Sequence, residues 1–286
     1  MSKIFNSIIS SYRDRVGSLR GYLCAMALAS KYVDKDSFEI VITDLGESEK
    51  VNALIKRYQG QMNIKHLSPL YNGIFWKSKA LNHCALNADG QYLTMIDIDA
   101  IVPPYFLNNI EKFYVDPAVK DVKLAHRVRF LNAKMSKLVT KMDFTEGILI
   151  KNIISQESKF RLAFERFTAE EIKSRGLKGH QKSWYRTQAL GNSHYTMRKE
   201  DFFAIGGYDE SFIGWACEDL DFNRRAFSYL NNGLLRPEIP YTVYSVYHNR
   251  QAWMDPKTTR RNEGLYALNK KNKVVILPIT KTWGEF

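Results

Sequence analysis

Residues 92–99 read Tyr-Leu-Thr-Met-Ile-Asp-Ile-Asp, an apolar run that ends directly in two acids. Its length and composition are those of a buried β-strand. Three similar runs lie upstream, separated by stretches with apolar residues at helical spacing. Strands are predicted at residues 4–9, 38–43, 62–66 and 92–96, and helices at residues 19–33, 50–59 and 78–88. This alternation predicts an α/β fold with a mostly parallel central sheet flanked by helices.

The rest of the chain carries a less regular pattern. Residues 220–230 predict a further helix, residues 241–246 and 274–277 predict strands, and Ser18 is the predicted N-cap of the first helix. Residues 120–188 are basic, with helical composition at 155–175 and an exposed loop predicted at 175–186. The central part of the chain is therefore the part whose structure the sequence predicts least.

Composition limits the class of protein. The chain has 286 residues, 45% of them hydrophobic, which suits one large α/β domain or two small ones. Its three cysteines are widely spaced, which argues against a disulfide framework or a zinc site. We see no secretory signal and no apolar run long enough to span a membrane, and we expect a cytoplasmic protein. The net charge of +12 favours anionic partners, although no known nucleic-acid motif is present.

Polar segments follow three of the predicted strands, at residues 10–15, 44–47 and 97–99. Ligands of open parallel sheets bind beyond the carboxyl ends of the strands, so these segments should line one edge. Asp97 and Asp99 are two residues apart and should point to the same side, where they could hold a hard cation. Taken alone, such a pair is equally well explained as solvated loop carboxylates.

A second constellation lies at residues 206–221. Gly-Gly-Tyr-Asp-Glu at 206–210 is followed by Gly-Trp-Ala-Cys-Glu-Asp-Leu-Asp at 214–221. Glu218 and Asp219 would lie in the first turn of a helix, whose dipole favours ionised carboxylates able to accept a proton. The alternative is helix capping with ion pairs to Arg224 and Arg225, which we accept for Asp221. Capping does not explain the preceding tryptophan and three glycines.

These motifs resemble those of inverting GT-A glycosyltransferases, including the carboxyl-terminal region of β-1,4-galactosyltransferases and bacterial family 2 enzymes. Residues 11–15 and 77–82 resemble the family's nucleotide-binding segments, in the same order along the chain. The resemblance covers residues 4–105 and 190–265. It implies a Rossmann-like GT-A fold with a smaller acceptor-side region. It also implies metal-dependent, inverting transfer of a hexose or N-acetylhexosamine from a UDP-sugar to an acceptor hydroxyl, in glycan or polysaccharide synthesis.

The resemblance also implies a role for individual residues. On the donor side, the nucleotide-sugar would be bound by Ser11, Arg13, Arg15, Asp44, Lys77, Lys79 and Asp97. On the acceptor side, Trp215 would shape the pocket, Glu218 would bind the acceptor and Asp219 would be the catalytic base. Asp99 would bind the metal.

His248 follows a predicted strand at the place where the family has a histidine metal ligand. Oxygen ligands with one imidazole suit Mn²⁺ somewhat better than Mg²⁺. The chain departs from the galactosyltransferase pattern at Ser245, where the animal enzymes have a methionine ligand. Among the other histidines, His194 is expected to have a structural role or to border the acceptor site.

We therefore predict a single catalytic domain with three parts: a nucleotide-sugar half at residues 1–105, a variable insertion at 106–190, and an acceptor half at 191–286. The expected acceptor is a glycan or another hydroxyl compound, and a nucleic-acid acceptor is the alternative. Two other classes remain open. A nucleotidyl- or phosphotransferase would also need metal and carboxylates, though not the Gly-Trp loop. A sugar- or nucleic-acid-binding module would keep the fold without turnover.

Overall fold

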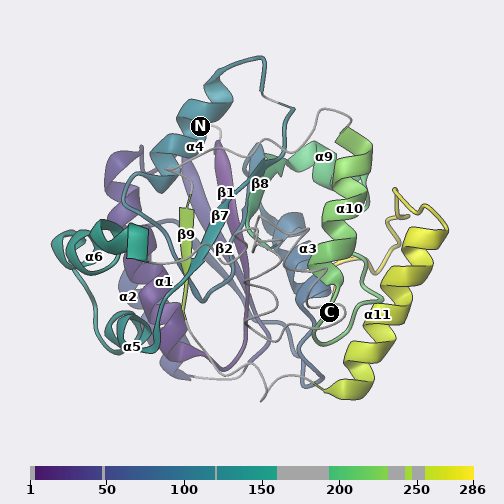
Figure 1. The fold of residues 1–286 in the computed structure, drawn as a ribbon, viewed down its shortest axis with the longest axis horizontal. Coiled ribbons are helices and arrows are strands. Elements are labelled where there is room, and N and C mark those ends of the chain that lie inside the picture. Colours follow the sequence, from purple (N-terminus) through teal and green to yellow (C-terminus); the bar gives the residue numbers. More distant parts are fainter. Residues whose placement is uncertain (1–3, 47–48, 120, 160–192, 231–241, 247–254) are drawn as a thin grey trace, which may run out of the picture.

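The structure is a computed structural model that describes residues 4–46, 49–119, 121–159, 193–230, 242–246 and 255–286. Its centre is a six-stranded sheet with the order β3-β2-β1-β4-β8-β6 (Figure 1). The first four are β1 (Asn6–Tyr12), β2 (Phe38–Asp44), β3 (Ile64–Leu67) and β4 (Tyr92–Met95), which are mutually parallel. Then β8 (Tyr195–Arg198) runs antiparallel to β4, and β6 (Leu124–Ala125) antiparallel to β8. The predicted mostly parallel sheet is confirmed.

A smaller sheet of three strands has the order β5-β9-β7. Its strands are β5 (Ala100–Ile101), β7 (Arg127–Phe130) and β9 (Thr242–Ser245). The chain passes from the large sheet into the small one between β4 and β5, through Asp97 and Asp99. Val246, just after β9, donates its backbone N–H to the carbonyl of Asp99 at 2.7 Å. The two acids therefore lie at the junction of the sheets.

Helices cover both faces of the large sheet (Figure 1). Successive strand residues face opposite sides, so Ile8 joins the core cluster under one set of helices and Ile9 the cluster under the other. The first set is α1 (Val16–Ala29), α2 (Glu49–Gln59) and α4 (Phe106–Val115), and the second is α3 (Lys77–Asn87), α9 (Lys199–Ala204) and α10 (Glu218–Leu230). Outside these lie α5 (Ala133–Lys141), α6 (Glu146–Asn152), α11 (Pro256–Lys271) and the 3₁₀ turns Ser30–Tyr32 and Ile154–Lys159.

Two local expectations were wrong. Helix α1 begins at Val16 without a side-chain cap, so Ser18 lies inside the helix and is not its N-cap. Residues 274–277 form no strand in the described carboxyl-terminal part, 255–286. Their backbone groups bond elsewhere: the carbonyl of Val274 accepts from Arg224 at 2.7 Å, and Leu277 N–H donates to the carbonyl of Ile205 at 3.2 Å.

In the central region the structure contains five elements that were not predicted from the sequence, namely α4, α5, α6, β6 and β7. The helix and loop expected within residues 160–192 lie outside the described residues. In the described parts of the chain, no helix is both long enough and apolar enough to cross a membrane.

Candidate active site

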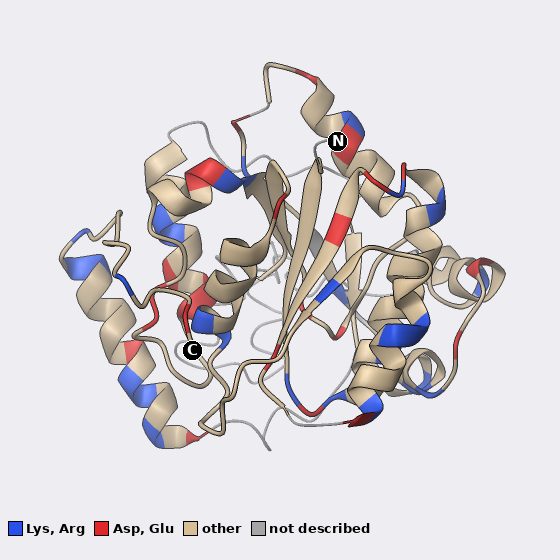
Figure 2. Cartoon of the chain, turned by 180° about the vertical axis from the view of Figure 1, so that it is seen from behind, with Lys and Arg blue, Asp and Glu red and all other residues tan. Residues whose placement is uncertain are grey.

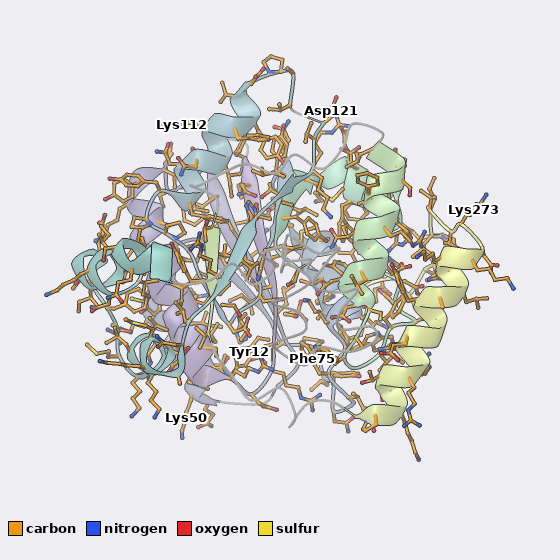
Figure 3. All side chains as sticks on the ribbon, in the orientation of Figure 1. Tyr12, Lys50, Phe75, Lys112, Asp121 and Lys273 are labelled. Carbon is orange, nitrogen blue, oxygen red and sulfur yellow. The ribbon has the colours of Figure 1, made fainter. Side chains whose placement is uncertain are left out.

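The carboxyl ends of the parallel strands gather the predicted donor-side residues at one edge. Tyr12, the last residue of β1, pairs with Asp44 of β2, and Asp97 lies two residues after the end of β4. Tyr12 and Phe75 lie at this edge, while Lys112 of α4 and Asp121 lie at the opposite one (Figure 3). Acidic and basic segments also meet near the start of α10 (Figure 2).

Lys77 joins the two constellations of acids. It begins α3, and its Nζ lies 2.9 Å from Asp97 Oδ1 and 2.9 Å from Asp219 Oδ2. Its side chain is only 9% exposed. Burial by itself would lower the pKa of Lys77, but Asp219 and Asp97 outweigh burial and raise it. One permanently charged ammonium therefore holds a strand-end carboxylate and a helix-start carboxylate together.

Asp97 is ionised at neutral pH because of this contact. Burial opposes the charge, but the Lys77 ammonium lowers the pKa of Asp97 to about 2. His194, just before β8, lies against the same acid, with its Nε2 3.9 Å from Asp97 Oδ2. Burial lowers the pKa of His194, so this imidazole is neutral at pH 7. His194 thus borders Asp97 itself.

Both carboxylate oxygens of Asp219 accept hydrogen bonds. Lys77 donates to Oδ2, and the phenol of Tyr208 donates to Oδ1 at 3.1 Å. The two donors hold the carboxylate of Asp219 in a fixed orientation.

Glu218, its neighbour, has a different environment. Its residue surface is 7% exposed, and Oε2 has no hydrogen-bond partner among the described residues. Burial, together with the charge of Asp219, raises the pKa of Glu218 to about 7. A buried carboxylate oxygen without a partner is costly, and a ligand hydroxyl could supply the missing hydrogen bond.

The loop before α10 is held in an unusual conformation. Ala216 and Cys217 have positive φ angles of 105° and 68°, which non-glycine residues seldom adopt. Asn262 of α11 donates to the carbonyls of Ile213 and Trp215 at 3.0 and 3.2 Å. Strained backbone of this kind persists where surrounding contacts fix it. The loop leaves Trp215 41% exposed.

Asp99 lies close to Arg15, one of the two arginines that follow β1. Arg15 is 3.3 Å from Asp99 Oδ2, and Arg13 donates to the carbonyl of Gly73. A carboxylate is a ligand that Mn²⁺ and Mg²⁺ accept, so Asp99 fits the predicted metal by its chemistry. Within the described ranges, no group of three or more potential ligands forms a metal cluster. His248, the second predicted ligand, lies outside those ranges.

Three other predicted donor residues are Asp44, Ser11 and Lys79, which have surroundings of their own. Asp44 is buried and accepts from Gly46 N–H at 2.8 Å, and His66 Nε2 lies 3.1 Å from its Oδ2. Ser11 is buried within β1. The ammonium of Lys79 lies 4.8 Å from the ring centre of Trp76, a cation–π contact.

Asp221 has the structural role expected for it. It is fully buried and pairs with Arg225 at 2.7 Å and Arg224 at 2.9 Å, which confirms the predicted i,i+3 and i,i+4 pairs. Sequence reasoning gave no role to Tyr208 or Asn82, although both lie in the motifs quoted above. It also missed Lys123, which is fully buried, with its Nζ 3.9 Å from the ring centre of Tyr195. Burial lowers the pKa of Lys123 to about 7.

The family described as glycosyltransferase like family 2 matches residues 25–249. The chain belongs to this family. The predicted family 2-like glycosyltransferase and the GT-A type of α/β fold are thereby confirmed, with the fold supported by solved glycosyltransferase structures.

Among curated proteins, validoxylamine A glucosyltransferase of Streptomyces hygroscopicus subsp. limoneus is 23% identical over 230 residues, or 79% of this chain and 46% of that protein. Hyaluronan synthase of Pasteurella multocida is 25% identical over 207 residues, or 67% of this chain and 20% of that protein. The chain thus spans about half the length, or less, of the curated relatives it matches.

Two solved structures illustrate the shared fold. TarS of S. aureus superposes with a TM-score of 0.61 at 15% identity, covering 94% of this chain and 40% of TarS. The mannosyltransferase PcManGT of Pyrobaculum calidifontis, in complex with GDP-Man and Mn²⁺, gives a TM-score of 0.56 at 13% identity, covering 94% and 64%. At these identities the likeness shows the fold alone.

Proposed function

We propose that this family 2-like glycosyltransferase moves a hexose or N-acetylhexosamine from a UDP-sugar to a hydroxyl of a glycan acceptor, with inversion at the anomeric carbon. Residues 1–105 would bind the donor, residues 191–286 would bind the acceptor, and residues 106–190 would be a variable insertion. A separate structure of TarS in complex with UDP-GlcNAc, with a TM-score of 0.58 at 15% identity, supports the choice of donor.

The proposal rests on the contacts of Lys77 with both Asp97 and Asp219, which we call the Lys77 bridge. The ammonium of Lys77 lies 2.9 Å from an acid at the donor edge and 2.9 Å from an acid at the start of α10. Group transfer between two bound substrates needs both to meet at one point, because proximity removes much of the entropic barrier. A side chain that contacts both regions supports a shared centre for donor and acceptor.

The reaction is a single displacement. The acceptor oxygen forms a bond to the anomeric carbon while the bond from that carbon to the phosphate oxygen breaks, and UDP leaves with the bonding electrons. Asp219 accepts the proton of the acceptor hydroxyl. The carbon passes through an oxocarbenium-like state, as in glycoside hydrolysis. Attack opposite the leaving group inverts the configuration.

The donor site would use Ser11, Asp44 and Asp97 for the nucleoside, and the arginines after β1 and Lys79 for the diphosphate. A divalent metal, Mn²⁺ or Mg²⁺, would be held by Asp99 and His248 and would supply Lewis-acid stabilisation of the diphosphate. Arg15, which already lies 3.3 Å from Asp99, would add positive charge at the same place.

The acceptor site would use Glu218 and Trp215. The unpartnered Oε2 of Glu218 offers a hydrogen-bond acceptor to a sugar hydroxyl. The exposed indole of Trp215 offers an apolar face on which a sugar ring can pack.

Donor turnover with and without metal tests the proposal. The protein is incubated with UDP-sugars and oligosaccharide acceptors, with Mn²⁺ or EDTA, and released UDP is measured. Asp219→Asn should lower kcat by about 10²- to 10⁴-fold, the usual contribution of a general base, while donor binding is retained. Asp36→Asn, an exposed acid before β2 at the far edge, is the matched control. Undiminished turnover in Asp219→Asn would remove the proposed base.

A further inference from the structure

The segment after α11, residues 274–286, folds back onto the glycine-rich loop that precedes α10, defined here as residues 205–214. Leu277 N–H donates to the carbonyl of Ile205 at 3.2 Å, and the indole of Trp283 donates to the carbonyl of Gly206 at 3.1 Å. Gly284 N–H donates to Glu210 Oε1 at 2.6 Å. The segment is thus hydrogen-bonded to the loop at three points.

Two glycines make this close approach possible. Gly206 and Gly207 have positive φ angles of 78° and 59°. A Cβ on Gly206 would lie 2.2 Å from the carbonyl oxygen of Leu277, and one on Gly207 would lie 2.4 Å from the ring of Trp283. Any side chain at either position would displace the segment. The sequence of the loop is therefore matched to the segment that covers it.

Asn82 of α3 connects this contact to Tyr208. Its amide accepts from Tyr208 N–H at 2.9 Å and donates to the carbonyl of Tyr208 at 3.0 Å. The same Nδ2 lies 2.9 Å from Glu210 Oε1, the atom that also receives Gly284 N–H. Helix α3, the loop and the covering segment thereby share one hydrogen-bond network around the backbone of Tyr208.

The side chain of Tyr208 carries the network to Asp219. Its hydroxyl accepts from Tyr195 at 3.0 Å and donates to Asp219 Oδ1 at 3.1 Å. Its ring stacks on Phe222, with ring centres 4.5 Å apart. Tyr208 is 1% exposed, and burial raises its pKa well above the usual range, so the phenol remains a donor.

We infer that Tyr208 is a positioning residue for the carboxylate of Asp219, and that residues 274–286 hold Tyr208 in that position through the glycine-rich loop. The inference rests on the proposed role of Asp219 as base. With Oδ1 fixed by Tyr208 and Oδ2 beside Lys77, the plane of the carboxylate is set before an acceptor arrives. A base fixed in its productive orientation avoids the cost of reorganising during the reaction.

Tyr208→Phe tests the first part, because it keeps the stacked ring and removes only the hydroxyl. It should lower kcat about tenfold, the effect of one hydrogen bond to a charged group, while the donor KM stays within about twofold. The matched control is Tyr114→Phe, which removes another buried phenol, one that bonds the carbonyls of Val122 and Thr196. It should lower stability and leave kcat unchanged. Equal kcat values for Tyr208→Phe and wild type, or equal losses in both variants, would overturn the inference.

Trp283→Phe tests the second part. It keeps an aromatic ring in place and removes the N–H that bonds Gly206. We expect the single variant Trp283→Phe to have a kcat about threefold below wild type. The double variant with Tyr208→Phe should have the same kcat as Tyr208→Phe, because the effects of two residues that act through one contact do not add. Additive losses would overturn this link. Full activity of Asp219→Asn would refute the proposed base, whereas an inactive Asp219→Asn beside a fully active Tyr208→Phe would refute only the present inference.

Discussion

The two groups of acids are positioned by different kinds of structure. Asp44 and Asp97 are fixed by the strands they end or follow, in a parallel sheet with regular register. Glu218 and Asp219 are fixed by a loop whose backbone bonds to side chains from elsewhere in the chain, including Asn82 and Asn262. We call Asp44 and Asp97 the strand-end region. We call residues 206–219, which include the first two residues of α10, the loop region.

This difference shows what each region can tolerate. Backbone hydrogen bonds between strands do not depend on side-chain identity, so the strand-end region should survive most single substitutions. The loop region depends on specific amides, glycines and positive φ angles, such as that of Ala216. Substitutions there should therefore affect turnover more than donor binding. Three substitutions test this contrast.

Removing the side chain that joins the two regions should have the largest effect. Lys77→Met leaves Asp97 and Asp219 partly buried without the ammonium that each contacts. Loss of one such preorganised charge should lower kcat about 100-fold. Steady-state turnover at saturating donor measures it, with Lys112→Met on α4, exposed at the far edge, as the control of equal charge change. Equal kcat values for the Lys77→Met and Lys112→Met variants would show that the two regions work independently of the Lys77 contacts.

A change confined to the strand-end region should act on donor binding. Asp44→Ala removes a buried carboxylate at the end of β2, and we expect the donor KM to rise about tenfold from the loss of one charged hydrogen bond. At saturating donor, kcat should change by less than about threefold, since Asp44 does not contact the loop region's acids. Donor titrations of Asp44→Ala and of the exposed Asp36→Ala provide the comparison. A loss in kcat at constant KM would contradict the contrast between the regions.

The third prediction concerns stability rather than turnover, and it involves Glu218. Its pKa is about 7 in the fold against 4.5 for the ordinary side chain, so between these pH values the folded state binds more protons than the unfolded state. The free energy of unfolding therefore decreases as pH rises through this window. Glu218→Gln cannot titrate, so relative to wild type its stability should increase from pH 5 to pH 8 by on the order of 2 kcal/mol.

Urea unfolding of both proteins at the two pH values measures this difference. Asp36→Asn serves as the control, because it removes an exposed acid. A stability difference between Glu218→Gln and wild type that is the same at pH 5 and pH 8 would show that Glu218 ionises normally in the fold.

The sequence predicted the parallel strands and the helices between them. Each of these depends on a periodicity that is visible within about ten residues, as in β2 and α3. The same holds for the pairs from Asp221 to Arg224 and Arg225, which need only helical spacing. Ser18 was wrongly predicted as a cap because α1 begins two residues earlier, at Val16. The strand at residues 274–277 was wrongly predicted because backbone groups there bond to Arg224 and Ile205.

The sequence by itself thus determined the class of fold, the order of its first strands and helices, and the position of Asp97 and Asp99 after β4. Only the tertiary structure decided that Lys77 and Asp219, 142 residues apart, meet within hydrogen-bond distance. It also decided that β8 joins the sheet antiparallel and that Tyr208 binds Asp219. The physical reason is that helical and strand periodicity are local properties of the chain. Contacts between distant residues depend on the path of everything between them, and that path is fixed only when the common core packs.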